Sequence, residues 1–304
     1  MAFALAGFSM LSVGDAVVKT MAGVWPGTAI AALRYSLAAI GLAAILWRAE
    51  GRSAFTIRNP GIQMGRAVAV GLSAVCFFLA IALMPLADAT TITFTQPMFV
   101  ALLSAAFLRE HTPAVAWLAI AIAFAGVLIV LRPNLAALGL AGLLPVGAAL
   151  GMAIMIMLNR QVAGGGSILA MQFVISAFAA PVLIVVAAMG HASGWSMFGV
   201  GMPGPSVIAR CALVAVTATI AHMLIYRATT EATASEIAPM TYVQLIVAMA
   251  LGWAMFGDAP DLVALGGAAL VITGGLILWR YQRNRARGSA PVQAAVASTA
   301  GTTE

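Results

Sequence analysis

The chain has 304 residues, of which 63% are hydrophobic and only 8% are charged, whereas a soluble domain carries roughly 25% charged residues. This composition excludes an ordinary soluble enzyme or binding domain and indicates a polytopic membrane protein. The net charge of +6 follows from basic residues that flank membrane spans, so it does not point to nucleic acid.

Ten apolar runs follow one another along the chain, and each has about 18 to 22 residues, enough to cross a hydrocarbon core of about 30 Å. They begin near Phe3, Thr28, Gly65, Asp88, Ala114, Gly139, Ile168, Val207, Ala234 and Leu262. We therefore predict an all-α fold with ten transmembrane helices. The first run is interpreted as a helix of the bundle and not as a signal peptide, because it lacks a basic start and contains Asp15 and Lys19.

The stretch from 87 to 132 resembles the stretch from 235 to 280, at an offset of about 148 residues. The matching pairs are Asp88 with Glu236, Phe94 with Tyr242, Gln96 with Gln244, Glu110 with Asp258, Gly126 with Gly274, and Arg132 with Arg280. A chance likeness between apolar segments is the alternative, but it does not explain the polar pairs. We expect five-helix repeats over 1–135 and 136–281, and a disordered cytoplasmic tail over 282–304. Because five spans are an odd number, the second repeat is inverted in the membrane, as is typical of transporters.

Basic residues indicate the orientation, since they collect in cytoplasmic loops. If the N-terminus is inside, the cytoplasmic side holds Arg48, Arg52, Arg58, Arg66, Arg109, Arg160, Arg227, Arg280, Arg283, Arg285 and Arg287. The opposite side then holds only Lys19, Arg132 and Arg210, and Arg34 stays inside a span. We therefore predict that both termini are cytoplasmic.

Asp15 and Arg34 are expected inside the membrane, where an ionisable side chain needs a partner or a wet cavity. Each lies about seven residues from the outer end of its helix, so the two are at similar depth. We predict an ion pair between them, with Lys19, one helical turn from Asp15, competing for the carboxylate. The pair could simply hold two helices together. Alternatively, Asp15, Lys19 or Arg34 contacts a charged substrate group or carries a coupling proton.

The run that begins near Val207 carries Thr219, His222 and Tyr226 at spacings of three and four, so these side chains share one helix face. The counterpart of Tyr226 in the first repeat is Phe78. Packing is the commoner role of such aromatic residues, but the repeated position and the neighbouring His222 favour a cavity wall. We assign His222 to hydrogen bonding with substrate above proton coupling, because no carboxylate accompanies it in the sequence.

The fourth and ninth runs each bring a proline, an aromatic ring and a glutamine into the membrane: Pro97, Phe94 and Gln96 in one, and Pro239, Tyr242 and Gln244 in the other. Pro97 removes a backbone donor and is expected to bend its helix. Phe94 and Gln96 are two residues apart, so in one helix they point in different directions and cannot line the same wall. We therefore predict Phe94 and Tyr242 as cavity residues, and Gln96 and Gln244 as either cavity residues or links between helices.

The fifth and tenth runs consist almost entirely of small and aliphatic residues, with glycines at 126, 266, 267, 274 and 275. Small residues let helices approach closely, so we predict packing surfaces or a homodimer interface outside the transport pathway. Cys76 and Cys211 fall in apolar spans without a metal or redox spacing. We accordingly predict no metal and no cofactor.

These features resemble the EamA-type members of the drug/metabolite transporter superfamily over nearly the whole chain before the tail. The motifs that carry the resemblance are Arg34-Tyr35, then Thr95-Gln-Pro-Met-Phe-Val-Ala-Leu-Leu-Ser, Leu108-Arg-Glu110 and Ala125-Gly-Val-Leu-Ile, then Gln244-Leu-Ile-Val-Ala-Met-Ala, Phe256-Gly-Asp258 and Thr273-Gly-Gly-Leu-Ile. The second copy departs from the family at Leu245, where proline is usual, and at Asp258, where glutamate is usual. Among these transporters the chain is most similar to the YddG-type exporters of aromatic and other amino acids.

The resemblance implies a multi-pass protein of the bacterial inner membrane that exports small metabolites by alternating access, around a cavity lined by helices 1 to 4 and 6 to 9. Amino acids, above all aromatic and other apolar ones, are the implied substrates. The side chains expected to bind them are Phe78, Phe94, Tyr226, Tyr242, His222, Gln244, Lys19 and the adaptable Met223.

Other functions remain open from the sequence. A sugar-phosphate or nucleotide-sugar transporter needs several cavity cations, and only Lys19 and Arg34 are candidates. An exporter of cationic drugs needs an acidic residue among aromatic rings, for which Asp15, Glu231 or Glu236 could serve. An intramembrane protease is disfavoured, because the sequence contains neither HExxH nor a complete Gly-x-Gly-Asp motif.

Overall fold

The computed structural model describes residues 2–108, 114–162, 166–231 and 238–300, and within these ranges every regular element is helical. The helices are α1 (Ala2–Lys19), α2 (Gly27–Glu50), α3 (Pro60–Leu83), α4 (Leu86–Thr93), α5 (Gln96–Leu108), α6 (Ala114–Leu138), α7 (Leu144–Gln161), α8 (Ile168–Ala192), α9 (Pro205–Glu231), α11 (Tyr242–Phe256) and α12 (Leu262–Ala300). Short 3-10 helices lie at Arg52–Phe55 (η1), Gly139–Leu143 (η2), Ser196–Phe198 (η3) and Ala238–Thr241 (η4). Of the described helical segments, nine are long and apolar enough to cross a membrane, and α11 is a shorter apolar helix. The chain is an all-α polytopic membrane protein, as predicted.

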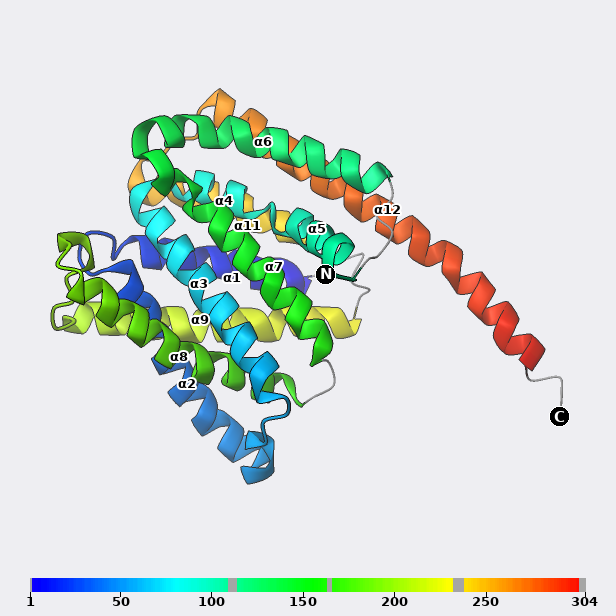
Figure 1. Ribbon diagram of the computed structural model, residues 1–304, viewed down its shortest axis with the longest axis horizontal. Coiled ribbons are helices and arrows are strands. Elements are labelled where there is room, and N and C mark those ends of the chain that lie inside the picture. The colour runs from blue at the N-terminus through cyan, green and yellow to red at the C-terminus, as the bar shows by residue number, and fades with distance from the viewer. Residues whose placement is uncertain (1, 109–113, 163–165, 232–237, 301–304) are drawn as a thin grey trace.

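The contacts between helices repeat in the two halves of the chain. In this comparison α1 corresponds to α7, α2 to α8, α3 to α9, the α4–α5 pair to α11, and α6 to α12. The α3–α7 contact corresponds to α1–α9, the α3–α8 contact to α2–α9, and the contact of α4 and α5 with α7 to that of α11 with α1. The α2–α8 and α6–α12 contacts each correspond to themselves. Figure 1 shows α6 and α12 side by side along one edge of the bundle and α2 with α8 along the opposite edge. Repeats related by a pseudo-twofold axis produce this exchange.

The outer half of the bundle is a packed core. We name the ends by the orientation that the basic residues predict: the outer end holds the loops 20–26, 84–85, 193–204 and 257–261, and the inner end holds the loop 51–59. Near the outer end, Met21, Ile30, Ile81, Leu86 and Val214 belong to one cluster and are each at most 2% exposed. These described side chains are closely packed near the outer end.

The fourth span is broken into α4 and α5 at residues 94–95. Pro97 has no N–H, and its ring disfavours helical backbone at the residue before it. The Thr95 hydroxyl donates instead to the carbonyl oxygen of Ile92 at 2.7 Å. The break directs Phe94 and Gln96 to the same cavity, described below. The expectation that these two residues could not share a wall assumed a continuous helix and is wrong.

The helices α6 and α12 pack against each other through their glycines. A Cβ atom on Gly126 would lie 2.5 Å from the carbonyl oxygen of Gly267, and one on Gly274 would lie 2.7 Å from that of Ala119. Backbones this close tolerate only glycine at these positions. The glycines at 126, 267 and 274 are therefore occupied within one chain, and a homodimer through the exposed faces of α6 and α12 stays a prediction.

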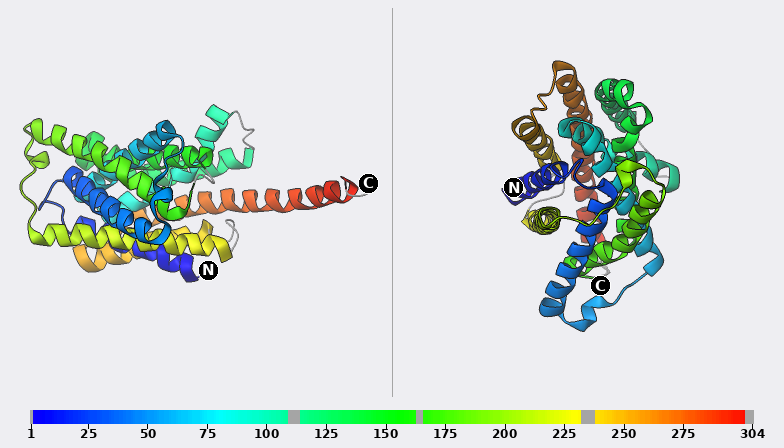
Figure 2. Two further views of the ribbon diagram at one scale, coloured as in Figure 1. Left: turned by 90° about the horizontal axis from the view of Figure 1, so that it is seen from below. Right: turned by 90° about the vertical axis from the view of Figure 1, so that its left-hand side faces the viewer.

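The last helix extends beyond the membrane-length segment. The apolar part of α12 ends at Tyr281, but the helix continues to Ala300 and projects from the bundle as a single rod (Figures 1 and 2). The disordered cytoplasmic tail expected over 282–304 stays a prediction.

Candidate functional site

A cavity of about 620 Å³ lies in the centre of the bundle. The described residues that line it come from α1, α2, α3, α4, α5, α7, α8, α9, η4 and α11, and none of them comes from α6 or α12. Sites for small organic ligands have volumes of roughly 300 to 1,000 Å³. The cavity therefore has the size and the central position of a substrate site.

The cavity extends from the inner end of the bundle towards the outer end. It reaches Asn159, near the end of α7, and Ile168, at the start of α8, both at the inner end. Towards the outer end the lining reaches Asp15, Thr90 and Ala148, each about one turn from the outer end of its helix. Among the described residues, the lining therefore comes closer to the helix ends on the inner side than on the outer side.

Asp15 is held on the cavity wall by a link between α1 and α11. The Gln244 side-chain amide donates to Asp15 Oδ2 at 3.4 Å. One turn earlier on α1, the Ser12 hydroxyl donates to the backbone oxygen of Gln244 at 2.6 Å. Both Asp15 and Gln244 line the cavity, so Gln244 serves as an interhelical link and as part of the wall.

Arg34 does not form the predicted ion pair with Asp15. Among the described residues, the ion pair within 4 Å joins Lys19 to Asp258. The guanidinium of Arg34 instead lies over the rings of Tyr35, at 4.5 Å from the centroid, and Phe78, at 5.3 Å. Cation–π contact with two aromatic rings holds Arg34 in place. Its charge and that of Asp15 both face the cavity and are available to a solute.

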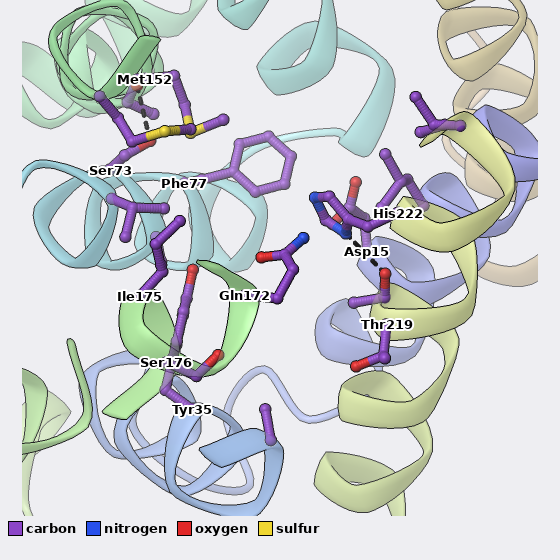
Figure 3. Close-up of a pocket in the computed structure, with 18 of the residues that line it drawn as sticks. Asp15, Tyr35, Ser73, Phe77, Met152, Gln172, Ile175, Ser176, Thr219 and His222 are labelled. Atoms are coloured by element: carbon purple, nitrogen blue, oxygen red, sulfur yellow. Dashed lines mark hydrogen bonds between the residues drawn. The ribbon is translucent and has the colours of Figure 1, made fainter. Parts of the chain in front are cut away.

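Polar side chains from α8 and α9 face each other across the cavity. Figure 3 shows Gln172 of α8 pointing towards Asp15 and His222, with Thr219 one turn from His222 on α9. His222 Nδ1 lies 2.6 Å from the backbone oxygen of Ala218. Because that oxygen can only accept, Nδ1 is the protonated nitrogen, and Nε2 of the neutral ring is left as an acceptor for a solute.

The rest of the wall is mainly aromatic and thioether side chains. The described members are Phe8, Phe77, Phe78, Phe94, Met152, Met155 and Met171. Aromatic rings bind apolar side chains through large contact area, and methionines adapt to irregular shapes. The wall suits a solute with an apolar or aromatic part.

Arg66 is a cavity residue that the sequence analysis missed. We counted it among the cytoplasmic loop residues because the third span was expected to begin near Gly65. The helix instead begins at Pro60, so Arg66 lies two turns inside it, lines the cavity and is only 2% exposed. Pro60 was the missed signal, since proline favours the first turn of a helix.

Three of the predicted binding residues lie away from the cavity. The side chains of two further predicted residues lie outside the part of the chain that the structure describes. Tyr242 lies behind Phe94, with ring centroids 5.5 Å apart, and its hydroxyl faces Gly275 of α12. Met223 is 48% exposed and is absent from the cavity wall, so it faces the lipid. Lys19 lies beyond the outer limit of the cavity. The side chains of Tyr226 and Pro239 are outside the described residues, and only the backbone of Pro239, in η4, is described.

Lys19 joins three elements at the outer end. Its Nζ donates to Asp258 Oδ2 at 2.6 Å and to the backbone oxygen of Met84 at 3.0 Å. It also lies 5.0 Å from the ring centroid of Phe256. The side chains of Lys19 and Asp258 are 12% and 26% exposed, so the pair is only partly screened by water. These contacts hold the end of α1 to the end of α3 and to the loop before α12.

We expect Lys19→Ala to loosen the outer end. A single cysteine introduced at Thr219, after replacement of Cys76 and Cys211 by alanine, would report on access to the cavity. A membrane-impermeant maleimide added on the outer side should label it several-fold faster in the Lys19→Ala variant. The charge-swapped pair, Lys19→Asp with Asp258→Lys, should restore slow labelling. Equal rates in Lys19→Ala and its parent would show that the ion pair does not hold this end closed.

The fold and the cavity define a polytopic membrane transporter. The sequence profile of the EamA-like transporter family matches residues 1–132 and 139–280. The chain therefore belongs to this family, within the drug/metabolite transporter superfamily.

Curated relatives with known names span most of the chain. A pseudopaline exporter of Pseudomonas aeruginosa (strain UCBPP-PA14) is 28% identical, over 92% of this chain and 95% of that protein. A riboflavin transporter of Rhizobium johnstonii is 26% identical, over 92% and 89%. An S-adenosylmethionine uptake transporter of Rickettsia bellii is 23% identical, over 75% of each chain. All three relatives are named as transporters of small metabolites, and none of these names is that of an enzyme.

A solved crystal structure has the same fold. It matches 93% of this chain and 98% of its own chain with a TM-score of 0.60 and 18% sequence identity. At this identity the likeness concerns the fold alone.

Proposed function

We propose that this protein exports amino acids, aromatic and other apolar ones above all, and related small metabolites. The observation that carries the proposal is the placement of an acidic side chain, Asp15, and a basic side chain, Arg34, in a cavity whose wall also carries aromatic and thioether groups. A free amino acid offers an ammonium, a carboxylate and a side chain to match these three features. The relatives are named for pseudopaline, riboflavin and S-adenosylmethionine, which supports a small organic solute in general.

Each part of the amino acid has a partner in the proposed site. Asp15, oriented by Gln244, accepts the ammonium, and Arg34, held over Tyr35 and Phe78, donates to the carboxylate. Charge-assisted hydrogen bonds of this kind are roughly twice as strong as neutral ones. Phe78 and Phe94 contact the apolar side chain.

The proposed cycle is alternating access between two inverted repeats. We place the repeats at 1–135 and 136–281, and we place both termini on the cytoplasmic side of the inner membrane. In that orientation the cavity faces the cytoplasm, ready to load an export substrate, and the Lys19–Asp258 pair and the packed core close the outer end. Separation of this end and closure of the inner end would release the solute outside.

Efflux from proteoliposomes loaded with labelled phenylalanine, tryptophan or methionine tests the proposal. We expect saturable flux that falls at least about tenfold in Asp15→Asn, because a charged hydrogen-bond partner is lost. Glu50→Gln, at the exposed end of α2, is the matched control and should transport normally. Flux that does not respond to an imposed pH gradient would identify facilitated diffusion. If folded protein moves none of these amino acids, the assignment is wrong, and labelled sugar phosphates and organic cations are the next substrates to assay.

A further inference from the structure

Arg66 is a buried cation with no counter-ion in the part of the chain that the structure describes. Its Nε donates to Asn159 Oδ1 at 2.6 Å, and its Nη1 donates to Gln63 Oε1. Both partners are neutral, and among the described residues no carboxylate forms an ion pair with Arg66. A guanidinium has five N–H donors, and these bonds use two of them. Burying an unpaired charge is costly, so this arrangement calls for a function.

The neighbours of Arg66 hold the guanidinium in one orientation. The Asn159 amide nitrogen contacts the sulfur of Met155 at 2.9 Å, and the Gln63 amide nitrogen contacts that of Met171 at 3.9 Å. Each amide therefore directs its oxygen to Arg66 and its NH₂ group to a thioether. Arg66 and Asn159 both line the cavity. The result is a fixed cationic group on the wall of a site that a solute can enter.

Packing of α3 against α7 does not require this charge. A Cβ on Gly151 of α7 would lie 2.8 Å from the backbone oxygen of Ala69 on α3. The Ser73 hydroxyl of α3 donates to the backbone oxygen of Ala148 on α7 at 2.7 Å. Close backbone approach and a buried hydrogen bond already join the two helices. A purely structural role therefore leaves the positive charge of Arg66 unexplained.

Arg66 and Arg34 mark opposite ends of the cavity. Phe78, on which Arg34 stacks, lies twelve residues after Arg66 on α3, and at about 1.5 Å per residue the two levels are about 18 Å apart along the helix axis. A free amino acid carries its ammonium and carboxylate on one carbon atom, so it cannot contact both ends at once. A solute that does so needs a second acidic group at a distance from its amino acid head.

We propose that Arg66 binds a second acidic group of the substrate, and that the substrate class therefore includes elongated amino acid derivatives with an acid at each end. This inference rests on the proposed function and extends it. The amino acid head lies between Asp15 and Arg34, an apolar middle part contacts the aromatic and methionine side chains, and the distal acid accepts hydrogen bonds from the free donors of Arg66.

A matched pair of solutes tests the role of Arg66. γ-Glutamyl-phenylalanine has an amino acid head, an aromatic ring and a distal carboxylate, and its C-terminal amide has the same shape without the distal charge. Binding is measured by titration of the purified protein in lipid nanodiscs. We expect the wild-type protein to prefer the acid at least about tenfold, Arg66→Gln to lose this preference, and Arg66→Lys to retain part of it. Arg58→Gln, an exposed basic residue at the same end, controls for general surface charge.

The outcomes separate this inference from the proposed function. Equal affinity of the wild-type protein for acid and amide, failure to bind either, or equal weakening of both solutes in Arg66→Gln would overturn the role of Arg66. Efflux of free phenylalanine alongside any of these results would leave amino acid export standing. Conversely, an acid preference that depends on Arg66, in a protein that moves no free amino acid, would support Arg66 and reject export of simple amino acids.

Discussion

Arg34→Gln should lower the affinity for phenylalanine at least about tenfold while leaving the protein folded, because a charge-assisted hydrogen bond to the carboxylate is lost. Arg34 lies over Tyr35 and Phe78 and faces the cavity without an ion-pair partner among the described residues. Its removal therefore breaks no salt bridge in the protein. A titration of each variant with phenylalanine and with phenylalaninamide measures the effect.

Phenylalaninamide, which lacks the carboxylate, distinguishes carboxylate binding by Arg34 from a packing role of its side chain. Wild-type protein should bind phenylalanine more tightly than phenylalaninamide, and Arg34→Gln should bind the two alike. Arg48→Gln, at the exposed end of the same helix, provides the matched control and should keep the wild-type preference. If Arg34→Gln weakens both solutes equally, Arg34 shapes the wall through its aromatic contacts and does not bind the carboxylate.

Gly126→Ala should destabilise the protein by roughly 1 to 3 kcal/mol, the usual cost of inserting a methyl group into a packed interface. The new Cβ would lie 2.5 Å from the carbonyl oxygen of Gly267 and 2.9 Å from Cβ of Leu270. Because the first of these atoms is backbone, relief requires α6 and α12 to move apart. Thermal unfolding in detergent should show a clear fall in Tm.

Gly266→Ala is the control for the effect of helix propensity. Gly266 lies next to Gly267 on α12, but its Cβ would meet no atom within 4 Å. Alanine is a better helix former than glycine by up to about 1 kcal/mol, so this variant should be as stable as the wild type or slightly more stable. Equal stability of Gly126→Ala and Gly266→Ala would refute tight packing of α6 on α12.

The membrane spans could be read from the sequence because they depend on local properties. A bilayer demands about twenty apolar residues per helix and internal pairing of the backbone, and both requirements are visible in composition alone. The helix boundaries were less certain. The third span begins at Pro60 and not near Gly65, and the expected start of the ninth span, near Ala234, lies outside the described residues. The difference at Pro60 hid Arg66 from the predicted site.

The partners of the charged residues could not be read in this way. Asp15 and Arg34 both line the cavity, but Asp15 accepts from Gln244 and Arg34 lies over aromatic rings. Lys19 pairs with Asp258, which is 239 residues away in the sequence. Spacing along one helix indicates which side chains share a face, but it does not indicate which other helix that face meets.

The sequence by itself determined that this protein is an all-α polytopic membrane protein and predicted its two similar halves, because hydrophobic length and repeated motifs are properties of the chain. Only the tertiary structure decided that α6 and α12 pack against each other through their glycines, that Tyr242 lies behind Phe94, and that Arg66 belongs to the cavity. The physical reason is that these facts depend on the rotation of each helix about its own axis and on its neighbours. Those are set by side-chain packing between segments far apart in the sequence.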